Sequence, residues 1–98
     1  MSDDEIDTLR LDVWLWRARA FKTRSLSMEY IKKRGVRVTR AGTTRKVKKP
    51  GATICVGDVV TYGRHDDIKV LEVLGLGERR GPPAEAQALY SLIEDDAS

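Results

Sequence analysis

The hydrophobic pattern of the chain begins with one face of a helix. The apolar residues that define this face are spaced by three or four positions and are Leu11, Trp14, Leu15, Ala18 and Phe21. This spacing predicts an amphipathic helix that starts near Arg10 and turns its apolar side toward a core. Trp16 lies to one side of the pattern, and we expect it to pack under the C-terminal segment; stacking on a base is the alternative.

A second helix is predicted from Arg24 to about Arg34. Thr23, just before it, is a typical N-cap residue, and Gly35, just after it, is a typical C-terminal stop. The residues expected to point inward are Leu26, Tyr30 and Ile31. A short corner should therefore join two neighbouring helices.

Beyond Gly35 the spacing of apolar residues changes to two, which predicts β-strands. Val36 and Val38 alternate with polar residues, and a turn and a basic loop are expected from there to Pro50. Further strands are predicted at Thr53–Val56, Val59–Tyr62 and Ile68–Leu74. No connection between them is long enough for a crossover, so the sheet should be antiparallel. Residues 84–93 return to helical spacing and predict a terminal helix.

Together these elements predict an α+β fold in which two N-terminal helices pack on a small antiparallel sheet, with a short C-terminal helix. A chain of 98 residues has room for one small core. We divide it into an acidic, disordered segment 1–9, a main domain 10–75 and a C-terminal extension 76–98. The expected core residues are Leu11, Leu15, Leu26, Ile31, Val38, Ile54 and Val60.

Charge is distributed very unevenly along the chain. Fourteen of the 18 Lys and Arg residues lie between Arg10 and Lys49, where Asp12 and Glu29 are the only acids, so this stretch carries about +12. The rest of the chain is acidic, and the overall net charge is +3. A field of one sign destabilises a compact chain by self-repulsion and favours a polyanionic partner, of which nucleic acid is the first hypothesis.

The segment from Lys22 to Ser25 matches what phosphate recognition requires. It offers two cations, two hydroxyl groups and a helix N-terminus at one corner. A solvated helix face is the alternative, but the acids that would form its salt bridges are missing. The residues we expect to bind nucleic acid are Arg10, Arg17, Lys22, Thr23, Arg24, Ser25, Lys32, Lys33, Arg37 and Arg40.

Catalytic and metal-binding chemistry has little support in the sequence. His65 is the only histidine and stands beside Asp66 and Asp67, which is typical of a solvated turn. Cys55 is the only cysteine, lies in an apolar run and is expected to be a small core residue. We therefore expect no enzyme activity, no metal and no cofactor.

The sequence also predicts where the protein acts. Its N-terminus is acidic, unlike a secretory signal, and no apolar run approaches the roughly 20 residues of a membrane span. We therefore expect a cytoplasmic protein that does not enter a membrane.

Several short motifs resemble the S4 RNA-binding domain, a helix-helix-strand module of ribosomal and RNA-modifying proteins. They are Arg10-Leu11-Asp12-x-Trp14-Leu15-Trp16, Phe21-Lys22-Thr23-Arg24-Ser25, Gly35-x-Arg37-Val38 and Val56-Gly57-Asp58-Val59-Val60. The Trp-Leu-Trp motif and the later Arg79-Arg80-Gly81-Pro82 resemble more narrowly the ribosome-associated heat shock protein 15 family. The resemblance spans residues 10–90.

The resemblance implies an S4-like fold and binding to structured ribosomal RNA on the large ribosomal subunit. It further implies a role in the rescue or recycling of stalled subunits under stress, with peptidyl-tRNA as another partner. We expect a monomer. Two alternatives stay open: an accessory RNA-binding module of an RNA-modifying enzyme, and a module that binds other polyanions, acidic proteins or anionic membranes.

Two features depart from the family pattern. The Asn-Gly expected in the strand hairpin is replaced by Thr39-Arg40-Ala41-Gly42, followed by what we expect to be a longer basic loop. The long basic C-terminal extension of some members does not occur in this sequence.

Overall fold

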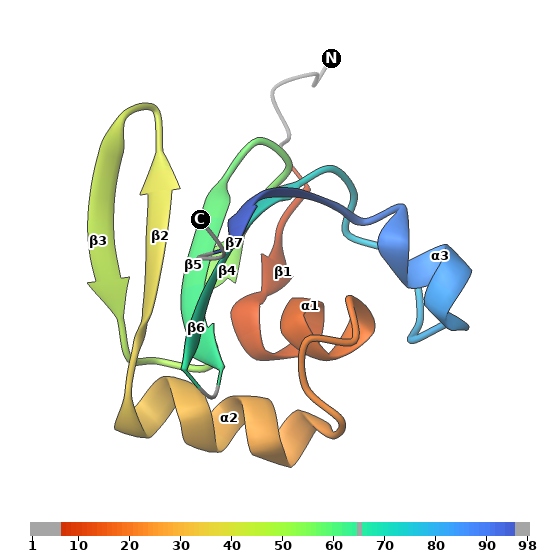
Figure 1. Ribbon diagram of the computed structural model, residues 1–98, viewed down its shortest axis with the longest axis horizontal. Helices are drawn as coiled ribbons and strands as arrows, with labels where there is room; N and C mark the ends of the chain where they lie inside the picture. The colour runs from red at the N-terminus through yellow and green to blue at the C-terminus, as the bar shows by residue number, and fades with distance from the viewer. Residues whose placement is uncertain (1–6, 65, 96–98) are drawn as a thin grey trace.

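The computed structural model describes residues 7–64 and 66–95 (Figure 1). Most of the acidic N-terminal segment and His65 lie outside these residues. The elements, in chain order, are β1 (Leu9–Arg10), α1 (Leu11–Arg17), α2 (Arg24–Lys33), β2 (Val36–Arg40), β3 (Thr43–Val47), β4 (Thr53–Ile54), β5 (Val59–Arg64), β6 (Asp67–Val73), α3 (Pro83–Gln87) and β7 (Tyr90–Asp95).

Five strands form one antiparallel sheet in the order β3-β2-β5-β6-β7, and β1 pairs separately with β4. Val38, Val60 and Leu71 are register partners on one face of the sheet, and all three are buried. Leu11, Trp14 and Leu15 of α1 and Ile31 of α2 join them in a single core. The predicted α+β fold with helices on a small antiparallel sheet is confirmed.

Helix α1 is shorter than its apolar spacing predicts. It ends at Arg17, and Arg19 then adopts a positive φ of 64°, a left-handed conformation that no α-helix continues through. The Arg19 guanidinium donates to the Gly81 carbonyl at 2.8 Å, which holds this corner against the C-terminal segment. Ala18 and Phe21 are nevertheless buried, so the apolar pattern identified core residues correctly although the helix does not reach them.

Helix α2 begins and ends where the sequence predicts, but one inward residue was assigned wrongly. The Thr23 hydroxyl accepts a hydrogen bond from the Leu26 N–H at 3.0 Å, and Gly35 has a φ of 81°. Ile31 is fully buried, whereas Leu26 is 47% exposed. Ser27 lies inward instead: it is fully buried, and its hydroxyl donates to the Asp12 carbonyl of α1 at 2.9 Å.

The basic loop expected after β2 is a strand. β3 pairs with β2 through a two-residue turn in which Ala41 and Gly42 both have positive φ, 52° and 83°. Two positive φ values at the centre of a hairpin correspond to a type I′ turn. Within β3 only Val47 is buried, so this strand lacks the alternation of buried apolar and exposed polar residues by which a strand is predicted. Exposed cations on an edge strand also keep it from pairing with other chains.

The predicted C-terminal helix is correct only at its start. Helix α3 ends at Gln87, and Tyr90–Asp95 forms β7, which pairs antiparallel with β6. The Leu89 carbonyl accepts from the N–H groups of Leu74 and Gly75, at 2.8 and 3.2 Å, and directs the chain onto the sheet edge. Hydrogen bonds to a strand distant in sequence therefore override the local helical spacing.

In the described part of the chain, no helix has the length and apolar character needed to cross a membrane.

Replacing Ala41 by glycine should stabilise the protein. Alanine pays a steric cost at the positive φ of 52°, whereas glycine adopts it freely and loses only part of the gain to its more flexible unfolded chain. We expect Ala41→Gly to raise the free energy of unfolding by about 0.5 to 1 kcal/mol and the melting temperature by roughly 2 to 8 °C.

Ala84→Gly is the matched control for this substitution, because Ala84 is an exposed residue of α3. It should lower the free energy of unfolding, by about 0.5 to 1 kcal/mol. Thermal or urea unfolding of both variants measures the difference. Equal destabilisation by the two substitutions would contradict the turn assignment.

Candidate nucleic-acid interface

The corner between α1 and α2 presents its polar residues to solvent. Lys22, Thr23, Arg24 and Ser25 are all exposed. Thr23 uses its hydroxyl oxygen as the N-cap of α2, which leaves its O–H free to donate. The corner thus offers two cations and two hydroxyl donors beside the positive end of a ten-residue helix.

Further cations continue from this corner onto the end of α2 and the adjoining sheet. Helix α2 spans about 15 Å, and its last turn carries exposed Lys32 and Lys33. Arg37 on β2 is exposed and lies directly across from Lys46 on β3. We call the following exposed residues the cationic face: Lys22, Arg24, Lys32, Lys33, Arg34, Arg37 and Lys46.

Lys46 was not among the expected contacts, and its place depends on the hairpin register. A groove of about 250 Å³ brings it together with Arg34, Arg37 and Thr61. The Lys46 side chain lies against Gly35: a Cβ at that position would lie 2.7 Å from Cε of Lys46, and the lysine would have to shift. The basic run in the sequence was a signal for Lys46, but nothing local showed that residues 43–47 pair with β2.

Three of the expected RNA-binding arginines have partners within the chain. Arg10 donates through Nε and Nη2 to the fully buried carboxylate of Asp12, each at 3.0 Å. Nη1 of Arg17 donates to the carbonyl of Gly77 at 2.6 Å, and its buried Nε has no hydrogen-bond partner among the described residues. Arg40 is bound to Asp58. These three side chains hold elements together, unlike the residues of the cationic face.

Asp58 is the centre of a small polar cluster. Its carboxylate is buried and accepts from Arg40 Nε at 2.8 Å, Arg40 Nη2 at 2.7 Å and the Cys55 N–H at 3.0 Å. Burial by itself raises the pKa of Asp58, but these hydrogen bonds and the guanidinium charge outweigh it, so the pKa lies below its ordinary value. The cluster ties β2 to the segment between β4 and β5.

Cys55 was expected to be a small core residue, but it is only partly buried. Burial, followed by the neighbouring Asp58 carboxylate, raises the pKa of the Cys55 thiol. A raised pKa keeps the thiol protonated and unreactive at neutral pH. Among the residues that the structure describes, no group of three or more His, Cys, Asp or Glu side chains could hold a metal ion.

Both tryptophans contact the chain that follows β6. The Trp14 indole N–H donates to the Gly75 carbonyl at 2.9 Å. The Arg80 guanidinium lies over the Trp16 ring, 5.8 Å from its centroid, and donates to the Trp16 carbonyl at 3.0 Å. The expected packing of Trp16 under the C-terminal segment is confirmed.

Comparisons with known proteins point to one family. No protein-family model matches the chain. It is 36% identical over 86 residues to the heat shock protein 15 homolog of Aeromonas salmonicida, covering 88% of this chain and 61% of that protein. It is 35% identical over 82 residues to heat shock protein 15 of Escherichia coli K12, covering 84% and 58%. The chain thus spans about three fifths of these curated relatives.

A solved structure supports the same relationship. Heat shock protein 15 of Vibrio cholerae, described as trimeric, matches with a TM-score of 0.74 and 30% identity. The match covers 88% of this chain and 82% of the Vibrio chain. The monomer expected for the present chain stays a prediction.

Asp58 should make stability depend on pH. Its pKa is lowered in the folded chain, so the ionised carboxylate stabilises the fold above the ordinary value of 3.8, and this stabilisation is lost as the pH falls through the folded value. We expect Asp58→Asn to lower the free energy of unfolding by roughly 1.5 to 3 kcal/mol at pH 7. Because the variant has no carboxylate at position 58, its free energy of unfolding should fall less than that of the wild type as the pH drops below about 4.

Urea unfolding between pH 2 and pH 7 measures both effects. Glu85→Gln is the control, because it removes a carboxylate from the exposed ion pair with Arg79 and should change stability little. If Asp58→Asn has a pH profile parallel to that of the wild type, the Arg40–Asp58 pair does not supply this dependence.

Proposed function

Because the chain belongs to the heat shock protein 15 family, we propose that it is a non-catalytic protein that binds structured ribosomal RNA on the large ribosomal subunit. The observation that carries the proposal is the cationic face, which runs from the helix corner along α2 to the β2–β3 hairpin. We assign RNA binding to residues 10–75.

The cations of this face are available to an outside ligand. In the described part of the chain, Lys22, Arg24, Lys32, Lys33 and Arg37 have no side-chain hydrogen bond or ion pair. Binding phosphate at these positions therefore breaks no internal contact. A guanidinium near a helix N-terminus, as at Arg24, can bind a phosphate through two hydrogen bonds.

The expected contact residues divide into two roles in this proposal. Direct contacts come from the corner, the end of α2 and β2, while the internally bonded arginines contribute charge from a distance and fix the surface. The direct contacts are Lys22, Thr23, Arg24, Ser25, Lys32, Lys33 and Arg37. The arginines that mainly fix the surface are Arg10, Arg17 and Arg40.

Folded RNA suits such a surface better than other polyanions. A-form helices hide their base edges in a deep, narrow groove and present phosphates and 2′-hydroxyls, which cations and hydroxyl donors on a rigid support recognise. The finer role in rescuing or recycling stalled subunits under heat stress, with peptidyl-tRNA as a partner, rests on family resemblance. We propose both this role and a cytoplasmic location on the same grounds.

Affinity for RNA should depend on salt and on the corner. If about five phosphates are neutralised, the logarithm of the binding constant should fall with the logarithm of salt concentration at a slope of roughly −3.5 to −4.5. The double variant Arg24→Ala, Lys32→Ala should bind a large-subunit rRNA transcript more weakly. Its slope should be flatter by roughly 1.4 to 1.8.

Filter binding at several salt concentrations measures the slopes. Arg79→Ala is the control, since it also removes a surface cation but one that is paired with Glu85 outside the cationic face. Equal affinity and slope for the double variant and the wild type would contradict the assignment of this face.

The protein should also sediment with large ribosomal subunits. Gradient fractionation of a lysate at near-physiological salt, followed by blotting, should place it in the large-subunit fractions, and the double variant should move toward the top. A wild-type protein that stays at the top, with and without stalled translation, would contradict the ribosomal assignment and favour the general polyanion alternative.

A further inference from the structure

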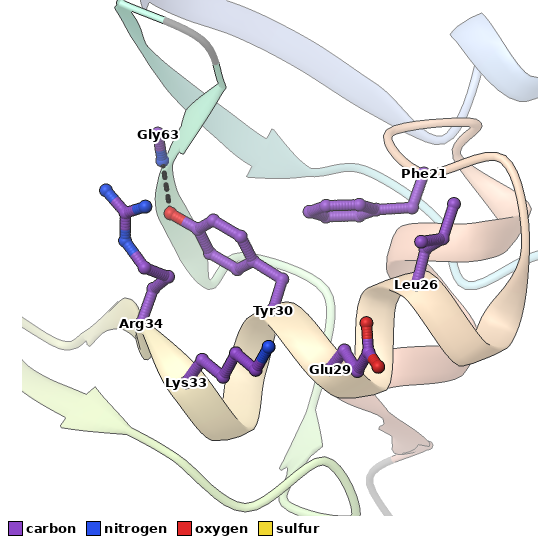
Figure 2. Close-up of a pocket in the computed structure, with 7 residues that line it drawn as sticks. All are labelled: Phe21, Leu26, Glu29, Tyr30, Lys33, Arg34 and Gly63. Atoms are coloured by element: carbon purple, nitrogen blue, oxygen red, sulfur yellow. Dashed lines mark hydrogen bonds between the residues drawn. The ribbon is translucent and has the colours of Figure 1, made fainter.

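An open groove with an apolar wall and a polar rim runs along α2, on the side where Tyr30 reaches Gly63 (Figure 2). Its volume is about 400 Å³, within the range of small-molecule sites. We call it the aromatic groove, and it is lined by Phe21, Leu26, Glu29, Tyr30, Lys33 and Arg34.

The apolar wall of the groove is held in place from behind. The Phe21 and Tyr30 rings pack with centroids 5.3 Å apart, and each also contacts the ring of Tyr62. The Tyr30 hydroxyl accepts a hydrogen bond from the Gly63 N–H at 2.7 Å, which fixes its ring against the end of β5 (Figure 2). The groove therefore exists before any ligand binds.

Leu26 gives this wall a surface that a ligand can cover. It is 47% exposed and lies in the first turn of α2, the helix that begins at the corner. A large apolar side chain among phosphate-binding residues adds nothing to the attraction of a polyanion. It does favour a flat, apolar group that follows the phosphates, such as an unstacked base.

The polar rim carries charges of both signs. Lys33 and Arg34 are exposed cations at one end of the groove, and Glu29 is an exposed acid between them and Leu26 (Figure 2). Glu29 has no side-chain hydrogen bond or ion pair with any residue that the structure describes. Asp12, the other acid of the basic stretch, is buried and bound to Arg10. Among the described residues of the groove and the cationic face, Glu29 is therefore an unpaired carboxylate, able to accept hydrogen bonds, that lies among exposed cations.

We propose that the aromatic groove binds one unpaired guanine of the RNA. Glu29 would accept from the guanine N1–H and 2-amino groups, while the phosphate of the same nucleotide meets Lys33 and Arg34. A carboxylate only accepts hydrogen bonds, and guanine alone among the four bases presents two adjacent donors on its Watson–Crick edge. Adenine, cytosine and uracil each place an acceptor beside a donor and repel one carboxylate oxygen. This inference rests on the proposed function and adds a base preference to it.

Titration with mononucleotides tests the groove separately from the rest of the surface. The full chain, labelled with ¹⁵N, is titrated with GMP, IMP and AMP while amide chemical shifts are followed by NMR. GMP should shift the amides of Leu26, Glu29 and Tyr30. IMP, which lacks the 2-amino group, should bind weaker by roughly tenfold, and AMP should bind no better than IMP.

Two variants separate the base contact from general charge. Glu29→Gln keeps the size of the side chain but loses one of the two acceptor oxygens, so GMP should bind it no more tightly than IMP. Glu78→Gln removes an equal charge from an exposed position outside the groove and should keep the preference for GMP. Because both variants lose one negative charge, the ratio of GMP to IMP affinity isolates the contact with guanine.

A fully paired RNA hairpin, measured in parallel, distinguishes this inference from the proposed function. If the protein binds the hairpin but shows equal affinity for the three nucleotides, or an unchanged ratio in Glu29→Gln, the guanine site is overturned and the proposed function stands. If the hairpin does not bind while GMP is preferred, the proposed function fails and the groove remains a guanine nucleotide site.

Discussion

The close contact between α1 and α2 at Ser27 determines which side of α2 meets solvent. Ser27 is fully buried, and its Oγ lies 2.9 Å from the carbonyl of Asp12 in α1. Ile31, one helical turn further along, is buried on the same side. With these two residues inward, Lys32 and Lys33 necessarily face outward, and so does Leu26. The cationic face and the exposed apolar residue beside it are consequences of one packing contact.

The arginines of the basic stretch serve two different purposes. Arg40 and Arg10 bind buried carboxylates with two hydrogen bonds each, and Arg17 and Arg19 donate to backbone carbonyls of the C-terminal segment. These contacts link α1 and β2 to later parts of the chain. They matter because a small domain has little apolar surface to bury. Among the residues that the structure describes, Lys22, Arg24, Lys32, Lys33 and Arg37 make no such contact, which is why we propose them as the phosphate contacts.

In the proposed RNA interface, attraction is combined with selection. Phosphate contacts fix position and supply affinity, but they carry no information about the base. The aromatic groove lies next to them and adds an apolar surface and a single acceptor, Glu29, whose charge opposes phosphate binding. An arrangement of this kind trades some general affinity for discrimination between nucleotides, which a uniformly basic surface would not provide.

The sequence by itself determined the elements whose signals are local. Thr23 and Gly35 mark the two ends of α2, because capping acts within one helical turn. The alternation at Val36 and Val38 identified β2. The charge imbalance, visible by counting, led to the expectation of phosphate contacts at the corner, which stays a prediction. Residues of α1 entered the core as their spacing indicated.

Tertiary structure decided what depends on partners distant in the chain. Nothing near β3 shows that it pairs with β2, because its exposed cations hide the strand pattern, and the position of Lys46 depends on that pairing. Residues 90–95 form a strand because β6 offers unpaired backbone groups, although their spacing suits a helix. Ser27, and not Leu26, lies inside, where its hydroxyl donates to the Asp12 carbonyl of α1, and neither this contact nor the groove along α2 has a signature in the sequence.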